Sequence, residues 1–292
     1  QRPQGEKRVN KIEFGDCRDT MRRWASEGVK AQMCVTSPPY FGLRDYGHEG
    51  QIGLEQTPEQ YIAAMVEVFR CVREVLADDG TLWLNIGDSY ARNAGPEESK
   101  LKTLHTMGVG QKKAHEMGAM RKGENKPPPG LKPKDLIGIP WMLAFALRAD
   151  GWYLRQDIIW HKPNPMPESV RDRCTKAHEY IFLLSKSEKY FFDSRAMKEQ
   201  SSTSAEEKRN RRSVWTVATR PYKGAHFATF PTALIEPCIL AGSRQNDIVL
   251  DPFMGSGTTA AVAIQHGRQY LGCELNPEYG SLQLERISNA TA

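Results

Sequence analysis

A short turn with two prolines, Thr36-Ser37-Pro38-Pro39-Tyr40, has residue types that could carry out a reaction. The prolines fix their own φ angles, so the turn is stiff. It could aim the Ser37 hydroxyl and the Pro38 carbonyl at one amino group, while Tyr40 stacks on a flat ring. An amine conjugated with a ring is a poor nucleophile, and two acceptors off the ring plane would localise its lone pair and accept its proton. We therefore predict Ser37, Pro38, Pro39 and Tyr40 as catalytic residues.

A second segment, Asp251-Pro252-Phe253-Met254-Gly255-Ser256-Gly257-Thr258-Thr259, follows a strand-like run and opens a helical one. Its glycines allow a close backbone approach, and a helix N-terminus offers free N–H groups. Glu274 ends the next strand, where a carboxylate can bind a ribose diol. These features fit any adenosine-containing cofactor. The segment has no P-loop lysine, and Asp251 would repel a pyrophosphate but attract the ammonium of a methionine moiety, which favours S-adenosylmethionine.

The elements around these turns alternate between strands and helices, which predicts a mostly parallel sheet with helices on both faces. Helical spacing of apolar residues and the Thr57-Pro58 start are clearest in the helix expected at 58–76. The expected strands are 10–15, 31–35, 81–86, 153–160, 180–184, 248–250 and 270–273, and the other expected helices are 135–148, 232–240, 258–266 and 277–287. We expect one domain over residues 1–292.

Two basic segments interrupt this pattern. Residues 92–134 hold ten Lys and Arg against four Asp and Glu, and residues 194–223 hold eight against three. The whole chain has a net charge of +5, so the remainder is slightly acidic. Concentrated basic charge beside an acidic body indicates a polyanionic partner, although solvated lysine-rich loops are the alternative. We expect 92–134 to be a basic, mobile insertion and 194–223 to be loop-rich.

Composition excludes several other classes of protein. The six cysteines show no CxxC spacing and several lie in apolar runs, which indicates reduced, buried thiols. The seven histidines lack paired-ligand spacing, so no metal is expected. No apolar run approaches the roughly 20 residues of a membrane span, and the N-terminus lacks an apolar signal region. We expect a cytoplasmic protein.

The order of the two motifs, TSPPY before DPFMGSGTT, resembles the beta class of DNA amino-methyltransferases, and the similarity covers most of the chain. The resemblance implies a Rossmann-like sheet of seven mostly parallel strands with helices on both faces. It also implies S-adenosylmethionine as cofactor, double-stranded DNA as partner, and a target base flipped out of the duplex. Members of the class often form dimers, so a homodimer is a further expectation.

The resemblance also implies roles for individual residues. Asp16 and Cys17 match the strand end that contacts the cofactor adenine. Trp160, Lys162 and Arg171 lie in or near a stretch that, with His178-Glu179, resembles the region of the target-base pocket, and we expect them to contact DNA; Trp160 could instead be core. Cofactor contacts are expected from His226, Phe227, Phe230, Pro231, Asp251, Phe253, Gly255, Ser256, Gly257, Thr258 and Glu274. In the short recognition region 194–223, Arg209, Arg211 and Arg212 are expected at DNA phosphates.

The first residue of the catalytic motif bears on the target base. SPPY is typical of cytosine-type members and DPPY of adenine-type members, so Ser37 favours the 4-amino group of cytosine over the 6-amino group of adenine. An RNA or protein methyltransferase usually shows NPPY after the cofactor motif, and this chain shows neither feature. A non-catalytic DNA-binding protein is disfavoured because both motifs are intact. Cys238, in a Pro-Cys pair, could be a nucleophile for carbon methylation, but its apolar helical surroundings indicate core packing.

Overall fold

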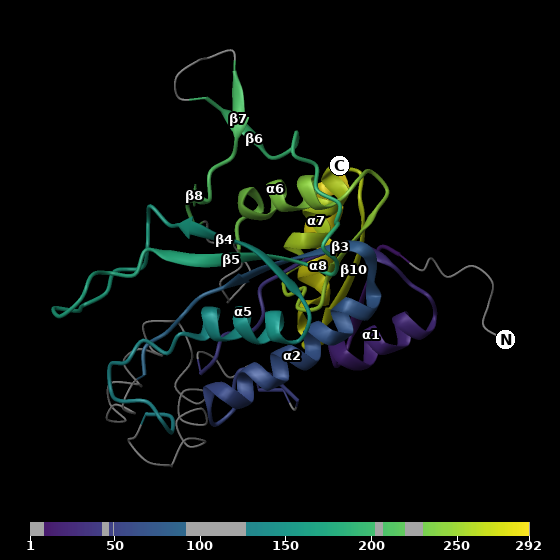
Figure 1. Cartoon of the computed structure of the whole chain (residues 1–292). Helices are drawn as coiled ribbons and strands as arrows, with labels where there is room; N and C mark the ends of the chain where they lie inside the picture. The colour runs from purple at the N-terminus through teal and green to yellow at the C-terminus, as the bar shows by residue number, and fades with distance from the viewer. Residues whose placement is uncertain are drawn as a thin grey trace.

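The computed structural model describes residues 9–42, 47–48, 50–91, 127–201, 207–219 and 230–291 (Figure 1). The predicted insertion 92–134 therefore lies mostly outside the described residues, as do His226 and Phe227. None of the described helices is long and apolar enough to cross a membrane.

Ten strands and six α-helices are assigned within the described residues. The strands are β1 (Lys11–Phe14), β2 (Ala31–Thr36), β3 (Leu76–Ile86), β4 (Tyr153–His161), β5 (His178–Ser185), β6 (Lys198–Gln200), β7 (Lys208–Asn210), β8 (Val214–Thr216), β9 (Ile248–Asp251) and β10 (Gln269–Glu274). The helices are α1 (Cys17–Ser26), α2 (Pro58–Val75), α5 (Ile139–Ala149), α6 (Thr232–Gly242), α7 (Thr258–Gln265) and α8 (Gly280–Thr291), with a 3₁₀ turn η1 (Pro277–Tyr279).

Eight of the strands form one sheet in the order β1-β10-β9-β2-β3-β5-β4-β8. All neighbouring pairs are parallel except those that β5 makes with β3 and β4. The predicted α/β fold with a mostly parallel sheet is therefore confirmed. Seven strands were expected, and the additional one is the short β8, which pairs with β4.

The centre of the sheet is the feature that positions the site. β2 and β9 are parallel neighbours, with Met33 opposite Val249 and Cys34 opposite Leu250. After β9 the chain continues through α7 to β10 on one side, and after β2 it continues through α2 to β3 on the other. Loops that diverge in this way leave a crevice at the carboxyl ends of the two strands, where α/β proteins bind their ligands.

Apolar side chains from alternating strand positions fill a core on each face of the sheet. In β3, Leu82 and Leu84 join the cluster covered by α1, α2 and α5, whereas Trp83 joins the cluster covered by α6 and α7. Figure 1 shows the two groups of helices on opposite sides of the strands. This two-faced burial explains why the central strands are almost continuously apolar in sequence.

Some elements differ from the sequence prediction. α1 was not predicted because its buried side chains, Cys17, Thr20, Met21 and Trp24, form a narrow stripe among charged residues. β6, β7 and β8 lie in the segment expected to be loop-rich, and each has only three residues. α5 begins at Ile139, later than expected, after Gly138 with a φ of 87°.

Candidate active site

The structure brings the two predicted turns to the same edge of the sheet. Thr36 is the last residue of β2 and Asp251 is the last residue of β9. The Thr36 hydroxyl donates a hydrogen bond to Asp251 Oδ1 at 2.6 Å. The Ser-Pro-Pro-Tyr turn and the Gly-Ser-Gly loop therefore start from two side chains that are bonded to each other, although 215 positions separate them in the chain.

Asp251 has a structural role that the sequence did not predict. Its side chain is inside the fold, with 1% of the residue exposed. Besides the bond from Thr36, Oδ1 accepts one from the Phe253 amide at 3.0 Å, and Oδ2 accepts one from the Thr259 hydroxyl at 2.6 Å. Asp251 thus ties β2 to both ends of the Gly-Ser-Gly loop. A contact of this carboxylate with the methionine ammonium stays a prediction.

The Asp251 network predicts a pH dependence of stability. Burial raises the pKa of Asp251 to about 6, against a partly compensating effect of its hydrogen bonds. Because the folded pKa exceeds the unfolded one, the resulting stabilisation is present at low pH and is lost as pH rises through about 6. We expect the stability of the wild type relative to Asp251→Asn to fall by about 1.4 kcal/mol between pH 5 and 8, measured by urea unfolding. A pH-independent difference would contradict this origin of the shift.

The Gly-Ser-Gly loop is held from behind by the last strand and the last helix. Gly255 and Gly257 have φ angles of 51° and 83°, a left-handed region that favours glycine. Glu274 Oε2 accepts a bond from the Gly255 amide at 2.7 Å, and the Gln283 amide donates to the Gly255 carbonyl at 2.6 Å. Arg286 donates to the Ser256 hydroxyl at 2.6 Å. Gln283 and Arg286 are supports that the motif alone does not reveal.

The Ser-Pro-Pro-Tyr turn is fixed by a buried tyrosine of α2. The Tyr61 hydroxyl donates a hydrogen bond to the Pro39 carbonyl at 2.8 Å, and the Tyr61 side chain is fully buried. Pro38 is also buried, whereas Ser37 is partly exposed. The turn therefore has a rigid inner side and leaves Ser37 partly exposed.

Tyr40 is anchored in a polar cluster at the ends of β3, β4 and β5. Its hydroxyl donates to Glu179 Oε2 at 2.6 Å, and the Asn85 amide donates to the same oxygen at 3.2 Å. Lys162 forms an ion pair with the other oxygen of Glu179. Burial and the Glu179 charge raise the pKa of Tyr40, so its hydroxyl stays protonated and donates. Sequence reasoning placed Glu179 near the target-base pocket but did not assign it this contact.

Comparisons with known proteins identify the family of this chain. Residues 31–285 match the family model described as DNA methylase, for N6 and N4 methylation. The chain belongs to the N6/N4 DNA methylase family.

Two curated relatives match this DNA methylase over most of their own length. The type II methyltransferase M.Cfr9I from Citrobacter freundii is 52% identical over 275 residues, covering 94% of this chain and 86% of the relative. M.SmaI from Serratia marcescens is 52% identical over 280 residues, with 95% and 90% covered. Among solved structures, the PvuII DNA methyltransferase, described as cytosine-N4-specific, superposes with a TM-score of 0.66 at 18% identity, covering 97% of this chain and 91% of that one. The M1.HpyAVI–SAM complex gives a TM-score of 0.56 at 19% identity, covering 95% and 98%.

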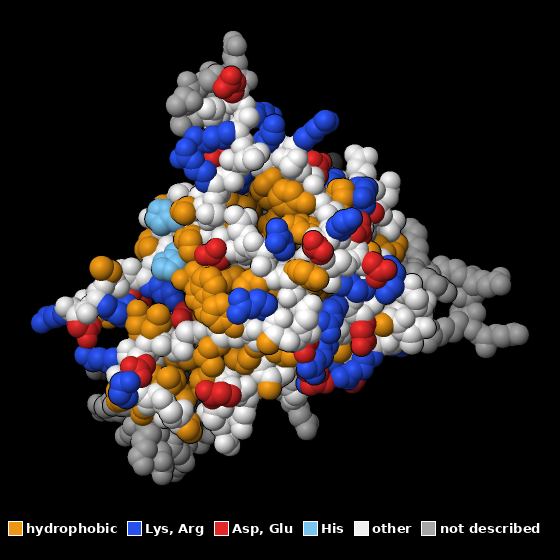
Figure 2. All heavy atoms as spheres, viewed as in Figure 1, with side chains coloured by type: hydrophobic (Ala, Val, Ile, Leu, Met, Phe, Trp, Pro, Cys, Tyr) orange, Lys and Arg blue, Asp and Glu red, His pale blue; other side chains and the backbone are white. Residues whose placement is uncertain are grey.

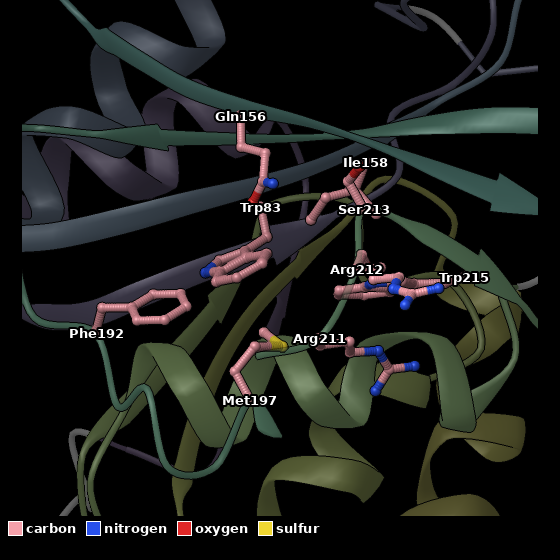
Figure 3. Close-up of a pocket in the computed structure, with 9 residues that line it drawn as sticks. All are labelled: Trp83, Gln156, Ile158, Phe192, Met197, Arg211, Arg212, Ser213 and Trp215. Carbon is pink, nitrogen blue, oxygen red and sulfur yellow. The ribbon is translucent and has the colours of Figure 1, made fainter. Parts of the chain in front are cut away.

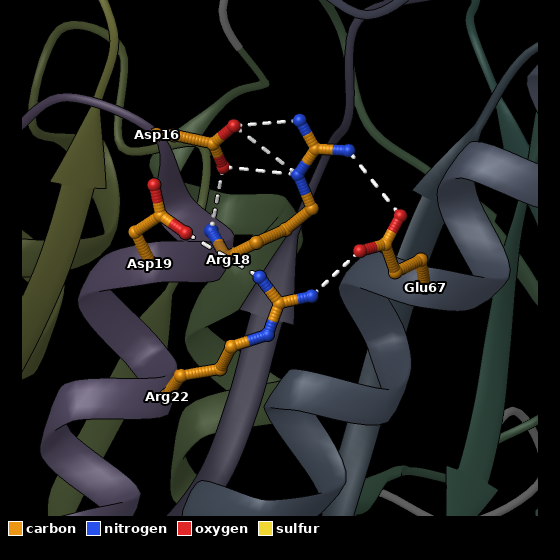
Figure 4. Close-up of polar contacts among 5 residues, drawn as sticks. All are labelled: Asp16, Arg18, Asp19, Arg22 and Glu67. Atoms are coloured by element: carbon orange, nitrogen blue, oxygen red, sulfur yellow. Dashed lines mark hydrogen bonds and ion pairs between the residues drawn. The ribbon is translucent and has the colours of Figure 1, made fainter.

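The predicted adenine-contacting residues of this DNA methylase begin α1 (Figure 4). Asp16 caps the helix by accepting from the Arg18 amide at 2.8 Å, and it also pairs with the Arg18 guanidinium at 2.6 Å. Glu67 of α2 pairs with both Arg18 and Arg22. The bonds from Arg18 keep the pKa of Asp16 low, so its carboxylate is charged, and it is partly exposed at the edge that also carries Glu274. Its contact with the adenine stays a prediction.

Most of the cysteines that were predicted to be buried are buried in the structure. Burial raises the pKa of Cys17 to about 12, so it is a packed thiol rather than an ionised ligand. Cys238 is fully buried in α6 and its pKa is also raised by burial, which confirms the core interpretation over that of a nucleophile. Cys174 differs, because it is exposed.

Trp160 does not lie where a DNA contact requires. It is 3% exposed, and its indole N–H donates to the Val217 carbonyl at 2.8 Å. The alternative that Trp160 is core is therefore correct, and stacking on DNA is wrong. Lys162 lies over this indole, with its Nζ 4.4 Å from the ring centroid, and is already paired with Glu179.

The predicted phosphate-binding arginines surround the β6–β7 hairpin, where Figure 2 shows Lys and Arg side chains gathered. Arg212 is exposed, Arg209 pairs with Glu199 across the hairpin, and the Arg211 guanidinium lies 4.3 Å from the Trp215 ring. A small hollow next to them contains none of the predicted catalytic or cofactor residues (Figure 3); its lining is Trp83, Gln156, Ile158, Phe192, Met197, Arg211, Arg212, Ser213 and Trp215. Because Arg209 is paired with Glu199 and Arg211 lies against Trp215, the exposed Arg212 is the arginine of the three best placed to reach a phosphate.

Proposed function

We propose that this DNA methylase transfers a methyl group from S-adenosylmethionine to the 4-amino group of a cytosine flipped out of double-stranded DNA. The observation that carries the proposal is the closeness of the two turns: the Ser37 turn and the Gly255–Gly257 loop leave adjacent parallel strands and are joined by the Thr36–Asp251 bond. The Ser37 turn has residues that can bind an amine, and the glycine loop has residues that can bind an adenosine-containing cofactor. This arrangement supports a site in which a methyl donor and its acceptor face each other.

The residues of the two turns have separate roles in this reaction. Bound S-adenosylmethionine supplies an electrophilic methyl group. The Ser37 hydroxyl and the Pro38 carbonyl accept hydrogen bonds from the target amine and localise its lone pair. They also accept the proton that the amine loses. Tyr40 stacks on the extruded ring, held in place by Glu179. Cofactor contacts are proposed for Glu274, at its ribose, and for the backbone of the glycine loop.

Two features favour cytosine over adenine. The motif begins with Ser37 rather than with an aspartate. The PvuII enzyme, whose fold this chain shares, is described as cytosine-N4-specific. Adenine methylation at the same site is the second candidate.

The product identifies the target base directly. DNA methylated by the purified enzyme is digested to nucleosides, which are separated and analysed by mass spectrometry. We expect 4-methylcytosine, since the catalytic turn matches the cytosine type. Finding only 6-methyladenine would reverse the assignment of the base while keeping the site.

Several proposals accompany this function. Arg171, Arg209, Arg211 and Arg212 are proposed to contact the DNA backbone, and 194–223 is proposed to carry sequence recognition within a single catalytic domain. His226, Phe227, Phe230 and Pro231 are proposed at the methionine end of the cofactor. We further propose that the enzyme is cytoplasmic, methylates chromosomal DNA in a restriction-modification system, and forms a homodimer.

A further inference from the structure

Met166 lies in the loop between β4 and β5 with 80% of its surface exposed, the highest value among the large hydrophobic residues that the structure describes. Single exposed apolar residues are common on protein surfaces and need no special explanation. The loop that carries Met166, however, is stiff, is fastened on both sides of this residue, and begins and ends at the predicted active site.

Stiffness comes first from the sequence. Proline occupies positions 163, 165 and 167, so three of the residues around Met166 have fixed φ angles. Asn164, two residues before Met166, is bound at both ends of its amide: its Nδ2 donates to the Thr219 carbonyl and its Oδ1 accepts from the Thr219 amide, each at 3.0 Å. This pair fixes the near side of the loop.

The far side is fastened by Glu168, two residues after Met166. Its Oε2 accepts hydrogen bonds from Arg173 at 2.6 Å and from the Lys176 amide at 3.0 Å. Met166 therefore lies between Asn164 and Glu168, whose side chains are both held by hydrogen bonds.

Both ends of the loop contact residues in or beside the polar cluster around Tyr40. At its start, Lys162 pairs with Glu179, which holds Tyr40. At its end, the Lys176 ammonium donates to the Asp88 carbonyl at 2.9 Å, one residue beyond Gly87. Figure 1 shows this loop projecting well beyond the ends of β4 and β5. The loop that carries Met166 is therefore tied at both ends to residues beside Tyr40.

We propose that Met166 is a wedge that enters the DNA as the target base leaves the stack. This inference rests on the proposed methylation of a flipped base. Extruding a base costs unstacking, and proteins that open base steps insert an apolar side chain such as Met or Pro. An unbranched thioether adapts to an irregular gap. The exposed Arg171 in the same loop is placed to hold the phosphate backbone around the wedge.

The test compares two substrates under single-turnover conditions. One is a duplex with the methylation site, as mapped by sequencing of DNA that the wild type has methylated. The other has an abasic site opposite the target base, so that extrusion is already easy. We expect Met166→Ala to slow methylation of the paired duplex by about tenfold or more, and to methylate the abasic duplex within about twofold of the wild-type rate. Met166→Leu should restore most of the lost rate.

Leu284→Ala is the matched control, because Leu284 is also 69% exposed but lies on α8; its rates should equal those of the wild type. The wedge is excluded if Met166→Ala methylates the paired duplex normally, or if it loses the same factor on both substrates. A wild type that leaves no methylated site in the DNA used for mapping would instead overturn the proposed function.

Discussion

Replacing Ser37 with alanine is expected to lower the single-turnover rate of DNA methylation by about 100-fold or more, with little change in the affinity for S-adenosylmethionine. The rate falls because the target amine loses one of its two acceptors. Cofactor binding is kept because the glycine loop is supported by Glu274, Gln283 and Arg286, none of which contacts Ser37 in the structure. Rates are measured by incorporation of a labelled methyl group, and affinity by calorimetry.

Ser26→Ala is the control for this change, since Ser26 is an exposed serine of α1 whose hydroxyl bonds only to its own helix, at the Arg23 carbonyl. It should leave both quantities unaltered. Wild-type methylation by the Ser37 variant would show that the reacting amine is held elsewhere.

Replacing Gly87 with alanine is expected to have a comparable effect through Tyr40. A methyl group at Gly87 would lie 2.8 Å from Tyr40 Cε2 and 3.2 Å from Glu179 Cδ. A ring atom of Tyr40 cannot give way as a flexible chain end would, so the ring must move and strain its bond to Glu179. Displacements of about 1 Å at a reacting group can cost about 100-fold in rate, which is the loss expected in kcat.

The glycine control is Gly280→Ala, because a methyl group there would make an ordinary 3.4 Å contact with Phe14 Cζ. The control should keep its kcat, and both variants should bind S-adenosylmethionine normally. A Gly87→Ala enzyme with wild-type kcat would mean that the position of the Tyr40 ring does not matter to the reaction.

The sequence predicted the parts of the site that are local in the chain. The Ser-Pro-Pro-Tyr turn, the glycine loop and Glu274 each follow a strand, and their positions at one edge of the sheet follow from the parallel pairing. The α/β architecture was predictable for the same reason, since the apolar runs and the helical periods have strong patterns. The helix α1 was not predicted because only a narrow stripe of its surface is apolar.

Contacts between distant residues were not predictable from pattern alone. Nothing in the sequence pairs Tyr61 with Pro39, or Glu179 with Tyr40, because such bonds depend on which elements the fold makes neighbours. The structural role of Asp251 was missed for this reason: the two threonine hydroxyls that bond its carboxylate come from β2 and α7. Trp160 was ambiguous because a tryptophan beside basic residues suits a nucleic-acid surface as well as a core.

The most direct test of whether the two turns form one site is a crystal structure of the enzyme with S-adenosylmethionine. We predict that the methyl group will point toward the Ser37 hydroxyl and the Pro38 carbonyl, with the ribose near Glu274 and the methionine beside the Gly-Ser-Gly loop. A cofactor bound at the opposite edge of the sheet, or in the hollow beside Trp83 and Trp215, would contradict the assignment of both turns to one reaction.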